Sequence, residues 1–160
     1  MINAEQLRCE IVRPACDALG RWSQGAENLL LLTCAVESRL GTYLRQLGGG
    51  PALGIFQMEP ATYRDIWTNY LAFRPEYVDA LERMTGLPAA VLRASPERMV
   101  WDLRYAAAMA RIHYLRVRST IPGTDNWPAL AVYWKDHYNT RLGAGTPGHA
   151  MEACRSCGLL

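Results

Sequence analysis

The chain has 160 residues, of which half are hydrophobic and a fifth are charged, and its formal net charge is +2. This length suffices to bury a hydrophobic core without disulfides or metal ions, and nothing in the composition indicates disorder. The charge is too small to indicate a nucleic-acid partner, and no apolar run approaches the roughly 20 residues that a membrane span needs. We therefore expect a single domain over residues 1–160.

The N-terminal residues and the cysteines indicate where the chain is made. Residues 1–6 contain neither a basic nor an apolar segment, so we expect no secretory signal. The five cysteines are odd in number and scattered, which favours reduced thiols made in a cytosol over a disulfide framework. Cys154, Cys157 and His149 offer three potential ligands, fewer than the four of a structural zinc site. We therefore expect no metal and no other cofactor.

The first third of the chain predicts two helices and a glycine-rich connection. Asn3 and Ser23 are suited to cap helix N-termini. Pro14 interrupts the first helix, and the second runs from about residue 24 to residue 40. The interval 41–53 contains four glycines and a proline, which is typical of a flexible loop or a short hairpin.

Prolines mark the starts of the helices that follow, because proline is favoured in the first turn of a helix and disfavoured in its interior. Helices are expected over about 60–70, 75–86 and 96–114. The last of these has a sustained helical spacing of apolar residues and several alanines that allow close packing. We expect it to be the central buried helix.

The end of the chain predicts one more helix and a tail. Asn126 is suited to cap a helix that reaches about Tyr138. Residues 143–160 begin with glycines and a proline, which predicts a loosely ordered tail. Strand-like segments are scarce throughout. The fold class is therefore predicted to be mainly α, with a minimal β or loop segment.

Glu37 breaks the local pattern. The preceding residues 29–36 contain Thr33 as their only polar member, so this helix must be buried up to Glu37. Carboxylates are rarely buried without a partner. Desolvation and the partial negative charge of a helix C-terminus would both raise the pKa of Glu37, as a general acid requires. The alternative is that Glu37 ends the helix in solvent or pairs with Arg39 or Arg45.

A second motif follows Glu37 and Ser38 in the sequence. Residues 54–60 read Gly-Ile-Phe-Gln-Met-Glu-Pro and place a neutral amide, Gln57, and a second carboxylate, Glu59, in a short extended segment before a helix. The pair of motifs resembles the Glu-Ser … Gly-Leu-Met-Gln-x-x-Pro signature of soluble lytic transglycosylases. The related goose-type lysozymes, also of the lysozyme-like superfamily, share this pattern.

The resemblance implies a lysozyme-like helical domain that cleaves the β-1,4 bond between N-acetylmuramic acid and N-acetylglucosamine in peptidoglycan. It implies that Glu37 is the catalytic acid/base, that Ser38, Phe56 and Gln57 bind the sugar chain, and that no cofactor takes part. Glu59 falls where goose-type lysozymes carry an Asp, and could act as a second catalytic residue that positions a water molecule. Alternatively, Glu59 merely favours the N-terminus of the next helix.

The role of Glu59 bears on the product. Lytic transglycosylases lack a second carboxylate and use the 6-hydroxyl group of the sugar as the nucleophile. A hydrolase usually has a second carboxylate, which activates water. The loop segment is expected to line the sugar cleft. Aromatic residues that could stack on sugar faces are Tyr43, Tyr63, Trp67 and Trp134.

A third element of the resemblance lies near the chain's end. Residues 129–133, Ala-Leu-Ala-Val-Tyr, are similar to the family's Ala-x-Ala-x-Tyr-Asn element, whose tyrosine lies near the catalytic Glu. Trp134 stands in place of the Asn, so Tyr133 is one candidate for the cleft tyrosine and Tyr138 is its rival. The resemblance covers about residues 27–139.

A signal-less domain of this kind fits a bacteriophage protein that is made in the host cytoplasm and acts on the bacterial cell wall, within the virion or at lysis. Its expected partners are peptidoglycan glycan strands and phage virion proteins. The changed residues after Tyr133 leave open a peptidoglycan-binding or structural virion component with little activity. A weaker alternative is a nucleic-acid-binding protein that uses Arg104, Arg111 and Arg118, although this heptad spacing favours a solvated stripe.

Overall fold

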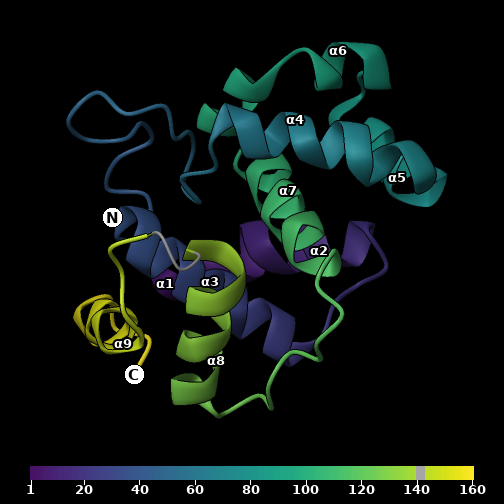
Figure 1. The fold of residues 1–160 in the computed structure, drawn as a ribbon. Helices are drawn as coiled ribbons and strands as arrows, with labels where there is room; N and C mark the ends of the chain where they lie inside the picture. The colour runs from purple at the N-terminus through teal and green to yellow at the C-terminus, as the bar shows by residue number, and fades with distance from the viewer. Residues whose placement is uncertain (140–142) are drawn as a thin grey trace.

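The computed structural model describes residues 1–139 and 143–160 and is mainly helical, which confirms the predicted fold class (Figure 1). The longer helices are α3 (Gln24–Ser38), α4 (Pro60–Asn69), α5 (Pro75–Thr85), α7 (Leu103–Leu115), α8 (Trp127–Trp134) and α9 (Pro147–Ser156). The shorter segments are α1 (Ala4–Gln6), α2 (Arg13–Ala18), α6 (Ala89–Arg93), π-helical turns at Leu7–Val12 and Lys135–Asn139, and 3-10 turns at Leu71–Phe73 and Pro96–Val100.

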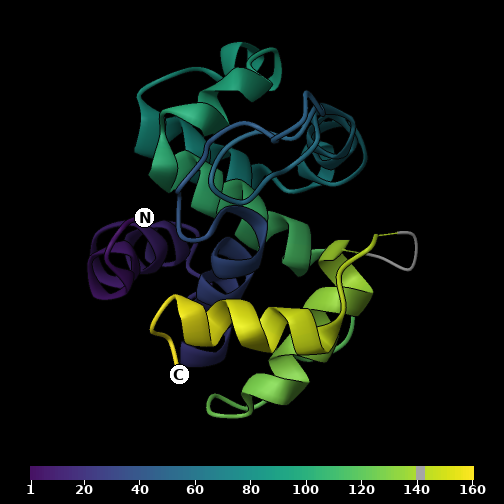
Figure 2. The same ribbon diagram turned by 90° about the vertical axis from the view of Figure 1, so that its left-hand side faces the viewer.

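Two groups of helices are joined by α7. On one side of the molecule lie α1, α2, α3, α8 and α9, and on the other lie α4, α5 and α6 (Figures 1 and 2). α7 runs between the groups and contacts α2, α3, α4 and α5. Across residues 1–139 and 143–160, no helix combines the length and apolar composition needed to cross a bilayer.

The predicted β or loop segment is a loop between α3 and α4. Within the described part of the chain no strand forms, and this loop carries isolated antiparallel bridges from Leu53 to Arg45 and to Met58. The Gln46 amide also donates to the Ala52 backbone oxygen at 3.0 Å. The loop is therefore folded back on itself like a short hairpin, beside the start of α4 (Figure 1).

α3 forms because its N-terminus is capped and most of its residues are apolar. Ser23 Oγ accepts a hydrogen bond from the Ala26 amide at 3.1 Å, as the sequence predicts. Residues 29–35 have no exposed surface, since α7, α8, α9 and the first helical segment pack around them. The helix ends where Arg39 adopts a left-handed conformation with φ of 51°. Glu37 is thereby held in the last turn of a buried helix.

α7 is the central buried helix that the apolar spacing predicts, but it begins later than expected. Residues 105–110 are at most 2% exposed. Pro96–Val100 forms a separate 3-10 turn, and Asp102 then caps α7 by accepting a hydrogen bond from the Tyr105 amide at 3.0 Å. The prediction of one helix over 96–114 was wrong at its start, because the Asp102 side chain takes an amide that a continuous helix would use.

The prediction of a loosely ordered tail over residues 143–160 was also wrong. Thr146 Oγ1 accepts a hydrogen bond from the His149 amide at 3.1 Å and caps α9. α9 packs on α3 and α8 and buries Ala150 and Cys154 completely. The glycines and the proline before α9 belong to a connection and a helix start rather than to disorder.

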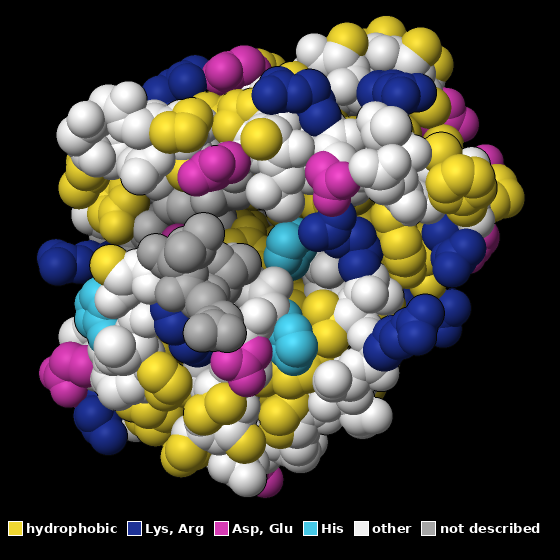
Figure 3. Space-filling model, viewed as in Figure 1, with side chains coloured by type: hydrophobic (Ala, Val, Ile, Leu, Met, Phe, Trp, Pro, Cys, Tyr) yellow, Lys and Arg dark blue, Asp and Glu magenta, His cyan; other side chains and the backbone are white. Residues whose placement is uncertain are grey.

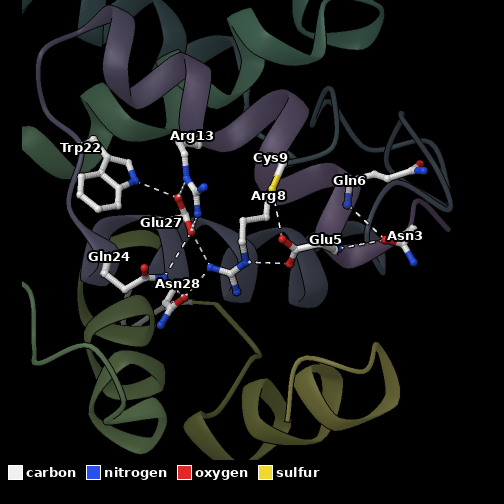
Figure 4. A network of polar contacts seen from close by, with 10 residues as sticks. All are labelled: Asn3, Glu5, Gln6, Arg8, Cys9, Arg13, Trp22, Gln24, Glu27 and Asn28. Carbon is white, nitrogen blue, oxygen red and sulfur yellow. Dashed lines mark hydrogen bonds and ion pairs between the residues drawn. The ribbon is translucent and has the colours of Figure 1, made fainter.

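A network of charged groups anchors the N-terminal end of α3 (Figure 4). Glu27 has no exposed surface and accepts hydrogen bonds from Arg8, Arg13 and Trp22 at 2.5, 2.8 and 2.8 Å. Burial alone would raise the pKa of Glu27, but these donors more than offset it and hold the pKa at about 2. The network ties the first helical segment to α3.

The arginines at heptad spacing do not share a solvated stripe, contrary to the prediction. Arg111 is 8% exposed, and its Nε donates to the backbone oxygen of Arg21 at 3.2 Å. Arg104 Nε donates to the backbone oxygen of Glu10 at 2.8 Å. Because α7 lies between other helices, this face is covered by protein at Arg111.

Candidate active site

A cleft of about 630 Å³ lies between the two groups of helices. It is formed by the last turn of α3, the loop before α4, the start of α4, the end of α7, the segment after α8 and the start of α9. Its polar and aromatic lining residues are Glu37, Tyr43, Gln46, Gln57, Glu59, Thr62, His113, Trp134, Tyr138, Asn139 and His149. The cleft therefore brings Glu37 of the first sequence motif together with Gln57 and Glu59 of the second.

Glu37 is a partly buried carboxyl group with one hydrogen-bond donor. Trp134 Nε1 donates to Glu37 Oε1 at 3.1 Å. Among the described residues no ion pair reaches Glu37, and Arg45 instead pairs with Glu97 at 2.6 Å. Burial raises the pKa of Glu37 to about 7, although the hydrogen bond from Trp134 acts in the opposite direction. A large fraction of Glu37 is therefore protonated at neutral pH.

Residues 54–58 form a tight turn rather than the extended segment that the sequence predicts. The Leu53 and Met58 backbones exchange two hydrogen bonds of 3.0 Å. Gly54 has φ of 73°, and a side chain there would meet the Met99 backbone oxygen at 2.3 Å, so only glycine fits. The turn is thus held against the segment that precedes α7.

Gln57 and Glu59 lie in the same cleft as Glu37 but differ in how they are held. Gln57 adopts a left-handed conformation with φ of 46°, and its Nε2 donates to the Gly54 backbone oxygen at 2.7 Å. No described residue donates to its side-chain oxygen, which can therefore accept a hydrogen bond from a ligand. Glu59 is exposed at the N-terminus of α4, where its side chain makes no capping hydrogen bond. Glu59 therefore does not cap α4 by a hydrogen bond, but its position at the N-terminus of α4 is still favoured by the helix dipole.

Ser38 and Phe56 do not line the cleft, contrary to the prediction that they bind substrate. Ser38 is fully buried, donates to the Ile55 backbone oxygen at 2.6 Å and accepts from the Gly41 amide at 2.9 Å. Phe56 is 1% exposed and its side chain belongs to the core. Both residues are turned inward because they join the end of α3 to the turn at residues 54–58, and their role is to hold that turn in place.

Of the two candidate tyrosines, Tyr138 lies at the cleft. The Tyr138 hydroxyl donates to the Phe56 backbone oxygen at 2.8 Å, and the side chain lines the cleft. The Tyr133 hydroxyl donates to the Ser119 backbone oxygen at 2.8 Å, outside the cleft, so the prediction that Tyr133 shapes the cleft was wrong. The reason is the π-helical turn Lys135–Asn139, which changes the direction of the side chains that follow α8.

His113 is a cleft residue that the sequence analysis did not single out. It follows the alanine-rich part of α7, and its Nε2 lies 2.9 Å from the His137 backbone oxygen. Burial lowers the pKa of His113 to about 4, so its imidazole is neutral at physiological pH. Its ring packs edge-on against Tyr138 with 4.9 Å between centroids. No sequence signal distinguishes this histidine from one in an ordinary core.

Only some of the aromatic residues considered for sugar stacking reach the cleft. Tyr43 lines it with part of its side chain exposed, whereas Trp134 borders it without exposed surface and is not free to stack on a sugar. Tyr63 is fully buried and shares a hydrogen bond with the Tyr105 hydroxyl, and Trp67 is 4% exposed. Tyr63 and Trp67 therefore belong to the core between α4 and α7.

The described cleft lining carries acidic and neutral groups. Its carboxylates are Glu37 and Glu59, and no Lys or Arg is among the described lining residues. Elsewhere, basic side chains are spread over the face seen in Figure 3, with acidic and apolar side chains between them. In residues 1–139 and 143–160 no group of three or more His, Cys, Asp or Glu is placed to hold a metal ion, and all five cysteines are free thiols.

Comparison of the chain with protein-family models, with curated proteins and with solved structures finds no match. The chemistry of the cleft must therefore be inferred from its own residues. A carboxyl group that is partly protonated at neutral pH can donate a proton, and amide side chains can bind hydroxyl and acetamido groups. The arrangement suits acid catalysis on a neutral, hydroxyl-rich substrate.

Proposed function

We propose that this protein cleaves the β-1,4 bond between N-acetylmuramic acid and N-acetylglucosamine in peptidoglycan, with Glu37 as the acid. The observation that carries the proposal is a carboxyl group with a pKa of about 7, without an ion-pair partner among the described residues, that lines a cleft together with several neutral hydrogen-bonding groups. The resemblance of the motifs around Glu37 and Gln57 to those of lytic transglycosylases and goose-type lysozymes supports the choice of substrate.

The reaction begins with proton transfer from Glu37 to the glycosidic oxygen. The bond between C1 of the muramic acid unit and that oxygen breaks, its electron pair goes to the leaving oxygen, and C1 acquires oxocarbenium character. Attack by the sugar's own 6-hydroxyl group gives a 1,6-anhydro end, whereas attack by water gives a reducing end. The proton released by the 6-hydroxyl group returns to Glu37, whereas the proton released by water passes to Glu59 if that carboxylate is the base, and Glu37 is then reprotonated from solvent.

Glu59 distinguishes these two routes. It lies in the cleft, is exposed, and makes no capping contact. A carboxylate in this place is suited to orient and deprotonate water, as in an inverting or single-displacement hydrolase. If water is the nucleophile, Glu59 is the general base; if the 6-hydroxyl group is the nucleophile, Glu59 only contributes to binding.

The neutral polar side chains of the cleft support a glycan as the ligand. Gln46, Gln57 and Asn139 offer amides that both donate and accept hydrogen bonds. Such groups fit the hydroxyl and acetamido substituents of a glycan strand.

Digestion of purified sacculi tests the proposal. Mass spectrometry of the soluble products should find cleaved glycan with the wild type and at least a hundredfold less with Glu37→Gln, because loss of general acid catalysis is expected to cost on the order of 10²–10⁴ in rate. Glu152→Gln, at an exposed position of α9, is the control and should keep full activity. The type of product end and the activity of Glu59→Gln then assign the nucleophile.

A wall-binding or structural virion component with little activity is the second candidate. The resemblance implies an Asn at the position of Trp134, which here contacts Glu37. This candidate is favoured because the replacement changes the surroundings of the Glu37 carboxyl group. Binding of the wild type to sacculi without release of products would support it. The proposed setting, synthesis in a host cytoplasm and action on the wall from a phage virion or at lysis, is checked by detecting the protein in purified particles.

A further inference from the structure

The contact between Trp134 and Glu37 joins two buried ends of helices. Trp134 is the last residue of α8 and has no exposed surface, and its Nε1 lies 3.1 Å from Glu37 Oε1. No other hydrogen bond from the described residues reaches the Glu37 carboxyl group. The second oxygen, Oε2, therefore has no protein partner within the described chain, while Glu37 itself lines the cleft.

The chemistry of the indole group makes this contact directional. An indole N–H can only donate a hydrogen bond, so the Oε1 atom that it meets must act as an acceptor. In the acid form of Glu37 the proton is accordingly favoured on Oε2. As the proton leaves, negative charge develops on the carboxylate, and a hydrogen bond to a charged acceptor is stronger than one to a neutral acceptor.

We propose that Trp134 is a positioning residue that directs the acidic proton of Glu37 to Oε2, toward the substrate, and stabilises the carboxylate that remains after proton transfer. This inference deepens the proposed function and its catalytic meaning rests on that function. The indole donates a hydrogen bond to Glu37 without adding a second titratable group or a positive charge.

The packing around Trp134 keeps the donor in place. Gly145 lies directly against the indole, since a side chain at that position would meet Trp134 Cη2 at 2.5 Å. α9, which follows Gly145, packs against both α3 and α8. The segment around Gly145 therefore packs directly against the indole and limits its movement.

The test is a direct measurement of the Glu37 pKa by ¹³C NMR of the glutamate carboxyl groups, assigned with Glu37→Gln. Trp134→Phe should raise this pKa by about one unit relative to the wild type, because a hydrogen bond to the charged form is lost. Site-specific replacement of Trp134 by benzothienylalanine, in which sulfur takes the place of the N–H at nearly constant ring volume, should give the same shift. Trp127→Phe, the same change at the other end of α8, is the control and should give none.

Kinetics provide the second readout. In Trp134→Phe, kcat on glycan strands should fall about tenfold with little change in KM, and the alkaline limit of the pH profile should move upward with the pKa of Glu37. The proposal is overturned if the Glu37 pKa is the same in the wild type and in the benzothienylalanine protein. Because the NMR titration needs no substrate, it also distinguishes failure of this inference from failure of the proposed function. If the Trp134 variants show the shifted Glu37 pKa but the wild type releases no glycan, the proposed function alone is rejected.

Discussion

Two glutamates in one helix have opposite acid strengths. Glu27 is buried with Arg8 and Arg13, and its pKa is held at about 2. Glu37 lies near the other end of α3, where Trp134 is its one donor among the described residues, and its pKa is raised to about 7. The difference comes from partners rather than from burial, since desolvation acts on both in the same direction. Glu27 is thereby a structural anion, and Glu37 is a weak acid suited to proton transfer.

The raised pKa of Glu37 makes a prediction about stability. The folded state binds this proton more tightly than the unfolded state, so the free energy of unfolding should fall as pH rises from about 4.5 to about 7. Glu37→Gln removes this loss and should be more stable than the wild type by roughly 1–2 kcal/mol at pH 8, after allowance for partial exposure, and equal to it at pH 4. Urea unfolding at both pH values measures the difference.

The control for this prediction is Glu152→Gln, whose side chain is 72% exposed. Its effect should be within about 0.5 kcal/mol at both pH values. A wild type and a Glu37→Gln variant whose stabilities run parallel from pH 4 to pH 8 would contradict the raised pKa.

At the scale of elements, the turn at residues 54–58 decides where Gln57 lies. Gly54 combines a left-handed φ of 73° with a close approach to the Met99 backbone. Gly86, which ends α5, has a similar φ of 69°, but a Cβ atom added there would have no other atom within 4 Å. The two glycines therefore separate the cost of the backbone conformation from the cost of a steric clash.

Gly54→Ala should lower the free energy of unfolding by about 3 kcal/mol or more, and should weaken glycan binding because it displaces Gln57. Gly86→Ala should cost only about 1 kcal/mol, the penalty of a left-handed alanine. Chemical denaturation measures both values. Equal losses in the two variants would show that the approach to Met99 is not what restricts residue 54.

The elements that the sequence predicted correctly are those specified by neighbouring residues. Ser23 and Asn126 cap their helices, and Pro60 begins α4, because each acts on the backbone of its own turn. The raised pKa of Glu37 was one of the alternatives that the apolar run before it predicted, and burial is its cause. These features need no knowledge of the tertiary structure.

Contacts between segments that are distant in the sequence could not be predicted. The Trp134 donor reaches Glu37 from another helix, and the choice of Tyr138 over Tyr133 depends on a π-helical turn that no local pattern marks. Ser38 has the residue type of a cleft hydroxyl, but its hydrogen bond to the Ile55 backbone turns it inward. For Tyr133 and Ser38, the error therefore concerns the direction in which a correctly located side chain points.

At the scale of the whole molecule, the two glutamates define a pH range of greatest stability. Glu27 contributes stability above about pH 4.5, and this contribution is lost as pH falls toward its folded pKa of about 2. Glu37 reduces stability as pH rises above about 4.5. Their combined contribution is therefore largest near pH 4.5 to 5, on the acidic side of neutrality.

Glu27→Gln should lower the free energy of unfolding by about 2 kcal/mol at pH 7, because it leaves Arg8 and Arg13 without their shared carboxylate. The loss should shrink as pH approaches 2, where about half of the wild-type Glu27 carboxyl groups are also protonated. Thermal unfolding monitored by circular dichroism from pH 2 to pH 7 checks this. A difference that stays constant over that range would mean that Glu27 is not ionised in the folded protein.

The burial of the thiols has a consequence for the chemical durability of the molecule. Burial raises the pKa of Cys16, Cys34 and Cys154 to about 12, and it also raises the pKa of Cys157. The reactive thiolate form is therefore scarce at neutral pH. All of these cysteines are free thiols, so the fold does not depend on a disulfide bond between them. The helical core should accordingly keep one structure whether its surroundings are reducing or oxidising, so passage between such compartments demands no refolding.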